Sequence, residues 1–152
     1  MRLEHEIPLD GLREKIQETL PTGIQVSSVE AVDEKSPPLQ TQVESAEYEV
    51  TLTDAATGSD LQRKIDSVMR AESIIRERRG KTYDLRPLIE ELQILESNGS
   101  PLAQEQAPAV QRIFMRLAAR EGATGRPEEV LDMLGIAFEG THIERTHLLF
   151  KT

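Results

Sequence analysis

Several short stretches of the chain alternate apolar with polar residues, which is typical of strands that bury one face. The alternation is clearest over residues 110–120, where the inward positions are Ile113, Met115, Leu117 and Ala119. Arginines take the outward positions of the same stretch, at Arg112, Arg116 and Arg120. The pattern predicts further strands over residues 2–7, 24–32, 47–52, 74–79, 92–96 and 143–150.

Apolar residues spaced three or four positions apart predict three helices, over residues 12–20, 61–69 and 127–134. Gly80-Lys81 is a predicted turn, and residues 97–109, rich in Gly, Pro, Gln and Ala, are a predicted loop. Residues 84–91 fit either a short helix or extended chain, so both interpretations stay open.

This order of elements favours an α+β fold. Because hairpins occur among the strands, we expect a two-layer, ferredoxin-like packing of βα units on a mainly antiparallel sheet. The recurring βα units also suggest an internal duplication. We predict one domain over residues 1–152, with Pro37-Pro38 forcing an extended break that can divide it into sub-units 1–35 and 43–152.

The composition fits an ordinary globular protein, with 38% hydrophobic and 30% charged residues. Aromatic residues make up only 3%, so the core must be built from aliphatic side chains. The net charge is −9, and residues 1–58 carry 12 acidic but only 4 basic side chains. An acidic total argues against a surface that wraps nucleic acid as a whole, but it leaves a local basic stripe open.

The chain has no cysteine, which excludes disulfides, thiolate metal ligands, Fe–S ligation and cysteine nucleophiles. There is no secretory signal and no apolar run of membrane-spanning length, so we expect a cytoplasmic protein without membrane contact. The histidines are expected on strands: His5 packed on an apolar face, and His142 and His147 on opposite faces of the last strand. We therefore predict no metal site, no cofactor and no catalytic residue, while enzymatic activity is left open.

Two glycine-containing motifs are candidate phosphate sites. Gly80-Lys81-Thr82 resembles the end of a P-loop, but Ile75 stands where that motif requires its first glycine. Residues 122–125 precede a helix start, where free backbone N–H groups can hold an anion. Glu128 and Glu129 would repel a phosphate there, which favours a plain turn.

Basic side chains gather in two places along the chain. The first is the stripe over residues 76–86, made of Arg76, Arg78, Arg79, Lys81 and Arg86. The second is a sheet face with Arg112, Phe114 and Arg116, which Arg145 and His147 would extend if their strands are neighbours. Sheet faces with aromatic residues and arginines bind single-stranded RNA. The alternative is a solvated outer face, since any half-exposed antiparallel strand places polar residues outward.

Short motifs in a fixed order run from about Leu3 to Phe150. They are Pro38-Leu39-Gln40, Ala46-Glu47-Tyr48-Glu49-Val50, Lys81-Thr82-Tyr83-Asp84-Leu85-Arg86-Pro87, Arg126-Pro127-Glu128-Glu129-Val130-Leu131 and Arg145-Thr146. Together they resemble the radical-SAM-linked protein family, a bacterial domain of unknown function fused to, or encoded beside, radical SAM proteins of the cobalamin-binding type. Family members usually begin with a segment carrying R-F-x-S-H-x-D, which this sequence lacks. The resemblance therefore implies the C-terminal part of such a protein.

The resemblance implies an accessory domain that docks to a radical SAM enzyme or presents its substrate, without catalysis of its own. It selects Lys81, Asp84, Arg86 and Pro87 as contacts, the alternative being that Arg86 pairs internally and Pro87 only shapes the backbone. With the basic residues, the candidate binding positions are Arg76, Arg78, Lys81, Asp84, Arg86, Arg112, Arg116 and Arg145. The alternative function is an RNA-binding module. If the front segment is absent, an uncovered strand edge can also pair with a second copy of the chain.

Overall fold

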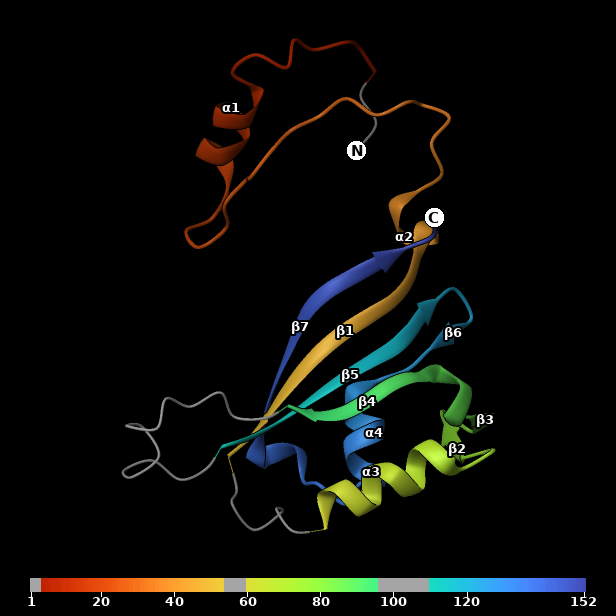
Figure 1. Ribbon diagram of the computed structural model, residues 1–152. Helices are drawn as coiled ribbons and strands as arrows, with labels where there is room; N and C mark the ends of the chain where they lie inside the picture. Colours follow the sequence, from red (N-terminus) through yellow and green to blue (C-terminus); the bar gives the residue numbers. More distant parts are fainter. Residues whose placement is uncertain (1–3, 54–59, 96–109) are drawn as a thin grey trace. The chain divides into compact units, whose positions relative to one another are not determined.

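The computed structural model describes residues 4–53, 60–95 and 110–152 (Figure 1). Its contacts divide the chain into two units, Met1–Pro37 and Pro38–Thr152. The division lies at the two adjacent prolines, whereas the independence of sub-units 1–35 and 43–152 stays a prediction. The predicted loop over residues 97–109 lies outside the described residues.

The first unit contains the helix α1 (Leu12–Thr19), where the apolar spacing predicted it. Gln17 holds the following segment against this helix. Its amide nitrogen donates to the carbonyl oxygen of Ile24 at 2.8 Å, and its amide oxygen accepts from the N–H of Val26 at 2.8 Å. A polar side chain, and not an apolar core, therefore organises this unit.

The strands predicted over residues 2–7 and 24–32 do not form at any described position. A strand needs a neighbour that takes up its N–H and C=O groups, and no segment of residues 4–37 supplies one. The alternation of apolar and polar residues is therefore present in these segments without a partner strand that would make them part of a sheet. His5, predicted to pack on an apolar strand face, is exposed in a bend.

The second unit is built on an antiparallel sheet of four long strands, β1 (Val43–Leu52), β4 (Ile89–Leu95), β5 (Gln111–Arg120) and β7 (Thr141–Phe150). Their order across the sheet is β4-β5-β1-β7, and the short strand β6 (Ala123–Thr124) pairs with β5. A single helical turn, α2 (Leu39–Gln42), leads into β1. Within the described residues, the strands predicted over 47–52, 92–96, 110–120 and 143–150 are confirmed.

Two helices complete the second unit, α3 (Leu61–Arg70) and α4 (Pro127–Met133), as predicted (Figure 1). The long elements form two βαβ units, β1-α3-β4 and β5-α4-β7. In the sheet, β5 lies between the two strands of the first unit, and β1 lies between the two strands of the second. This arrangement is the ferredoxin-like one. The expected two-layer α+β fold with a mainly antiparallel sheet is therefore confirmed, while duplication stays a prediction.

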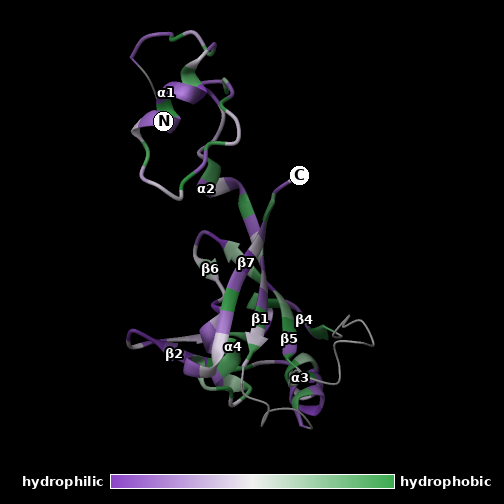
Figure 2. Ribbon diagram, turned by 90° about the vertical axis from the view of Figure 1, so that its left-hand side faces the viewer, coloured by the Kyte–Doolittle hydropathy of each residue, from purple (hydrophilic) through white to green (hydrophobic). Residues whose placement is uncertain are grey.

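The core lies between the two helices and one face of the sheet. Three of the predicted inward residues of β5, Ile113, Met115 and Leu117, are completely buried, but Ala119 is only half-buried. Figure 2 shows apolar and polar bands alternating along β1 and β7. The helices contribute the buried side chains of Leu61, Ile65, Val68, Val130 and Leu131. These helical side chains pack against one face of the sheet in a single cluster. The polar residues of the strands therefore lie mainly on the opposite face.

Between α3 and β4 the chain forms a separate hairpin of β2 (Ile75–Arg78) and β3 (Lys81–Asp84). Its turn consists of Arg79 and Gly80, with φ of 52° and 75°. Positive φ at both central residues gives the mirror-image turn whose twist matches that of the flanking strands. The predicted strand over residues 74–79 is confirmed, and the turn lies one residue earlier than expected.

Residues 84–91, which fit either a helix or extended chain, contain both. A 3₁₀ turn, η2 (Arg86–Leu88), is followed directly by β4. Pro87 lies in the first positions of this turn, where its missing N–H costs no hydrogen bond. A second 3₁₀ turn, η3 (Phe138–Gly140), leads into β7.

Candidate functional site

The sheet face opposite the helices carries the arginines of β5, as predicted. However, β1 lies between β5 and β7, so the strands expected to share a basic platform are not neighbours. The register of β1 places Glu47 opposite Arg116 and Glu49 opposite Phe114. The intervening strand is therefore acidic, and the expected basic platform is interrupted.

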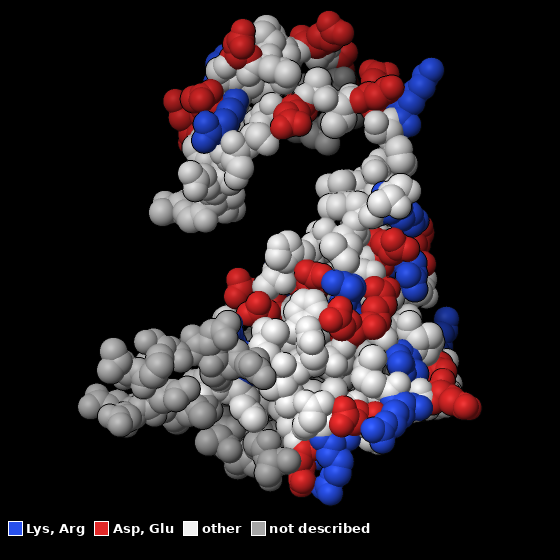
Figure 3. Space-filling view, in the orientation of Figure 1, with Lys and Arg blue, Asp and Glu red and all other residues white. Residues whose placement is uncertain are grey.

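Each arginine of this face contacts a carboxylate. Figure 3 shows basic and acidic side chains of the described residues next to one another. Glu47 is the most shielded of the paired side chains, at 14% exposed, and most of the others are at least one-third exposed. Exposed ion pairs contribute only about 0–1 kcal/mol, so the face resembles the solvated alternative. The pairs are Arg112–Glu49 at 3.4 Å, Arg116–Glu47 at 2.7 Å, Arg116–Glu91 at 3.1 Å, Arg120–Glu90 at 3.4 Å and Arg120–Glu44 at 3.9 Å.

A bulge in β7 changes which of its side chains share a face. His147 lies opposite Glu47 and Arg145 opposite Tyr48, so β7 has an extra residue between these two positions. Arg145 therefore lies on the face of Tyr48, and the prediction that it shares a face with His147 is wrong. The same bulge places His142 and His147 on one face, where opposite faces were predicted.

The remaining candidate residues gather around the β2–β3 hairpin. Arg76 and Arg78 come from β2, and Lys81 and Asp84 from β3. A cleft of about 440 Å³ opens between this hairpin and the turn that joins β5 to β6. Its lining residues are Arg78, Arg79, Lys81, Tyr83, Asp84, Leu88, Gly122, Ala123 and Thr124.

Glu129 of α4 fixes one wall of the cleft. Its carboxylate accepts hydrogen bonds from Arg78 Nε at 2.7 Å and from Arg78 Nη2, which gives a bidentate pair. The hydroxyl of Tyr83 donates to the same carboxylate at 2.5 Å, and the Arg78 guanidinium lies 4.8 Å from the centre of the Tyr83 ring. Arg76 adds an ion pair to Asp132 on the same helix. The hairpin is thereby fastened to α4.

These contacts shift the pKa values of the cluster. Partial burial by itself would raise the pKa of Glu129, but the hydrogen bonds from Arg78 and Tyr83 outweigh it and hold the pKa below the ordinary value of 4.5. Burial, reinforced by the hydrogen bond to Glu129, raises the pKa of Tyr83 above 10.0. The cluster therefore combines an ionised pair with a neutral phenol at neutral pH.

Arg86 makes its contacts within the chain. Its guanidinium donates to the carbonyl oxygens of Met69 at 3.0 Å, Ala71 at 3.1 Å and Ile89 at 2.9 Å. The carbonyl groups at the end of a helix have no partner inside the helix, so a cation there satisfies them. Arg86 thus fastens the end of α3 to β4, which is the internal role that the sequence left as an alternative.

Asp84 also has a full set of internal partners. Its Oδ1 accepts from the backbone N–H of Ile74 at 2.7 Å and of Arg86 at 3.0 Å, and its Oδ2 accepts from the hydroxyl of Ser73 at 2.9 Å. These hydrogen bonds, that of Ile74 foremost, lower the pKa of Asp84 below 3.8. The carboxylate fixes the base of the hairpin.

Asp84→Asn is expected to lower the free energy of unfolding at neutral pH, because the amide keeps only one acceptor oxygen for three donors. The folded pKa lies below the unfolded one, so the stabilisation is present above about pH 3.8 and is lost as pH falls through the folded pKa. Urea unfolding should show a larger deficit at pH 7 than at pH 3. An equal deficit at both pH values, or the same deficit in Asp10→Asn, would contradict this.

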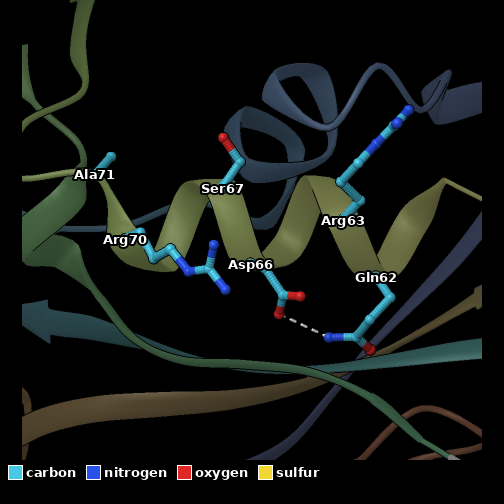
Figure 4. Close-up of a pocket in the computed structure, with 6 residues that line it drawn as sticks. All are labelled: Gln62, Arg63, Asp66, Ser67, Arg70 and Ala71. Atoms are coloured by element: carbon cyan, nitrogen blue, oxygen red, sulfur yellow. Dashed lines mark hydrogen bonds between the residues drawn. The ribbon is translucent and has the colours of Figure 1, made fainter.

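A second hollow, of about 750 Å³, lies along α3 (Figure 4). All of the residues that line it lie between Gln62 and Ala71, so a single helix and its end supply the lining. Figure 4 shows Gln62 pointing toward Asp66, to which its amide donates at 2.9 Å. A binding site usually draws side chains from several elements, so we interpret this hollow as a solvated helix face.

Within the described ranges, no three His, Asp or Glu side chains gather as metal ligands would. His147 Nδ1 lies 3.3 Å from Glu47 Oε2, but that carboxylate already pairs with Arg116. Among the helices of the same ranges, none combines the length and the apolar character needed to cross a bilayer.

Sequence reasoning selected cations of the hairpin but missed the side chains that position them. The sequence pattern assigns Glu129 a negative charge at the start of a helix, and it assigns neither Glu129 nor Tyr83 a contact with a hairpin cation. Arg78 and Glu129 are 51 positions apart, and such a contact is visible only once the topology is known. One signal was present, because both missed residues lie inside the motifs that carry the family resemblance.

Comparison with known proteins identifies a family but no characterised relative. Residues 1–127 match the family described as "Uncharacterized protein conserved in bacteria (DUF2344)". The match includes β1, α3, the β2–β3 hairpin and β5. No curated protein and no solved structure matches the chain. The chain belongs to the uncharacterised bacterial family DUF2344.

Proposed function

We propose that this chain is an accessory domain that docks to a partner protein through residues 4–37, and that the partner is a radical SAM protein, as the sequence resemblance implies. One observation carries the docking role. Among residues 4–37 no side chain is buried, although nine large aliphatic ones are present; five are half-buried and four are exposed. The four exposed ones are Ile7, Leu9, Ile24 and Val32, exposed by 48%, 46%, 53% and 79%.

A unit of this size rarely builds a stable core on its own, because too little of its surface can be buried. Polar contacts hold parts of the unit together, such as the hydrogen bond from Arg13 Nε to the carbonyl oxygen of Val26 at 2.9 Å. Burying each exposed aliphatic side chain would contribute about 1.5–3 kcal/mol, before the costs of association. Apolar side chains spread over an extended segment suit a protein surface better than a small ligand.

The charge of the unit indicates what kind of surface would receive it. Residues 4–37 carry eight acidic and three basic side chains. Complementary charge steers association and suppresses wrong partners, so we expect an apolar patch bordered by basic side chains on the radical SAM protein. We also propose a cytoplasmic location, with which the cysteine-free composition is compatible.

Ile24→Glu combined with Val32→Glu is expected to weaken binding to a purified cobalamin-type radical SAM protein from the same organism by about tenfold or more, because two apolar contacts are replaced by charges. Isothermal titration calorimetry measures the affinity. The matched control is Ser27→Glu combined with Ser28→Glu, which adds the same charge at exposed polar positions of the same segment.

Three results would count against this proposal. The first is no binding by the unaltered chain, and the second is an equal loss of affinity in both double variants. The third is a fall in the melting temperature of the isolated Ile24→Glu and Val32→Glu chain, because those side chains would then be packed within the chain itself.

The structure gives less support to the other partners that the sequence suggested. RNA binding was predicted to use Arg76, Arg78, Arg79, Lys81, Arg112 and Arg116. Four of these, Arg76, Arg78, Arg112 and Arg116, form ion pairs with carboxylates of the chain. Pairing of a second copy along β7 stays a prediction. Within the described residues that edge has no partner strand, but bulges and charged residues on an edge strand discourage pairing.

A further inference from the structure

We propose that the cleft between the β2–β3 hairpin and the β5–β6 turn binds a phosphate-bearing small molecule. Its lining residues lie between positions 78 and 124, outside the segment on which the docking proposal depends. Three properties of the cleft lead to this assignment: the sign of its charge, the fixed placement of its cations, and the apolar part of its lining.

The cleft is positive although the chain carries a net charge of −9. Its lining includes Arg78, Arg79 and Lys81 against one carboxylate, that of Asp84, whose oxygens already accept three hydrogen bonds. Arg78 is neutralised by Glu129. Within the described residues, the side chains of Arg79 and Lys81 have no hydrogen bond or ion pair, so both are available to an anion.

The backbone holds these two cations in place. The two-residue turn fixes Arg79 and Gly80, and Lys81 follows at the first position of β3. The bidentate pair between Arg78 and Glu129 fastens the same hairpin to α4. Binding therefore has to order only the two side chains and not the loop that carries them, which limits the entropic cost. A guanidinium binds phosphate through a fork of donors, and an ammonium adds a compact charge.

The rest of the lining indicates that the ligand is larger than a bare phosphate ion. Tyr83, Leu88 and Ala123 contribute apolar surface, and the Arg78 guanidinium stacks near the Tyr83 ring at 4.8 Å. The volume of about 440 Å³ falls in the range of small-ligand pockets, about 300–1,000 Å³. The chemistry fits a phosphate monoester with a planar or apolar group, and adenosine 5′-monophosphate is a suitable probe.

The test is a two-dimensional NMR titration of the full chain at low salt, with inorganic phosphate and adenosine 5′-monophosphate as separate probes. The amide signals of Gly80 and Gly122 should shift with both, and the nucleotide should bind more tightly. Arg79→Gln combined with Lys81→Gln should weaken both affinities by about tenfold or more. The matched control, Lys64→Gln combined with Arg70→Gln, removes two positive charges from α3 and should leave them unchanged.

Several outcomes would overturn the proposal. One is the absence of shifts at Gly80 and Gly122 with both probes at millimolar concentration. Another is an equal loss of affinity in both double variants, which would indicate diffuse attraction to net charge. A third is binding of a single-stranded RNA oligonucleotide that falls steeply with salt while the mononucleotide does not bind. Since Arg79 lies in an exposed turn and Lys81 directly follows it, the dispersed spectrum of the unaltered chain should persist in their variant.

Discussion

Arg86→Ala is expected to lower the free energy of unfolding by about 3 kcal/mol, because three backbone carbonyl groups lose one charged donor at once. Those carbonyls belong to Met69, Ala71 and Ile89, at 2.9–3.1 Å from the guanidinium. Two of these carbonyl groups lie at the end of α3, and the third lies at the first residue of β4. The substitution therefore removes a connection between two elements that enclose the core. Urea unfolding at neutral pH measures the change.

The matched control for this prediction is Arg112→Ala. This substitution also removes a guanidinium group. The contact between Arg112 and Glu49 is long, at 3.4 Å, and both side chains are more than one-third exposed. The expected loss there is below about 0.5 kcal/mol. The loss of unfolding free energy in Arg86→Lys should lie between those of Arg86→Ala and Arg112→Ala. An ammonium group keeps the charge, but it lacks the fixed fork of donors that reaches three carbonyl oxygens. Equal losses in Arg86→Ala and Arg112→Ala would mean that the end of α3 does not depend on this side chain.

Glu129→Gln is expected to lower the free energy of unfolding by about 2 kcal/mol at pH 7, because Arg78 loses the carboxylate with which it pairs and stays partly buried. The pKa of Glu129 lies below 4.5 in the folded chain. Its contribution is therefore present above about pH 4.5 and is lost as pH falls through the folded pKa. The deficit of the variant should shrink as urea unfolding is repeated from pH 7 down to pH 3.

A second measurement separates the role of Glu129 from a general loss of stability. The hydrogen bond to Glu129 is one cause of the raised pKa of Tyr83, so this pKa should fall toward 10.0 in Glu129→Gln. The control is Glu128→Gln, an exposed neighbour on the same helix, which should leave the pKa of Tyr83 unchanged. An unchanged Tyr83 pKa in Glu129→Gln would contradict the arrangement of the cluster.

The spacing of apolar residues correctly predicted those elements whose own sequence pattern matches the side chains that they bury. In β5 every second residue from Ile113 to Leu117 is buried, so alternation identified both the strand and its inward face. The same signal failed over residues 24–32, where alternation is present but the described part of the chain offers no neighbouring strand. A strand is a property of two segments, and only the topology shows whether the second is available.

The candidate site was predictable only in part, for a related reason. Basic composition identified the hairpin cations, but their availability depends on neighbours that are distant in sequence. β1 inserts Glu47 and Glu49 beside the arginines of β5, and α4 brings Glu129 to Arg78. One bulge in β7 moved Arg145 to the other face. The sequence alone could not show which basic side chains form ion pairs and which, such as Arg79 and Lys81, do not within the described residues.

The docking role can be tested most directly by hydrogen–deuterium exchange of the full chain, alone and with a purified cobalamin-type radical SAM protein. Exchange slows where backbone amides become protected by a partner. We expect slower exchange within residues 4–37 in the mixture, and unchanged exchange in β5 at the centre of the sheet. Protection confined to residues 38–152, or identical exchange with and without the radical SAM protein, would contradict the proposed function.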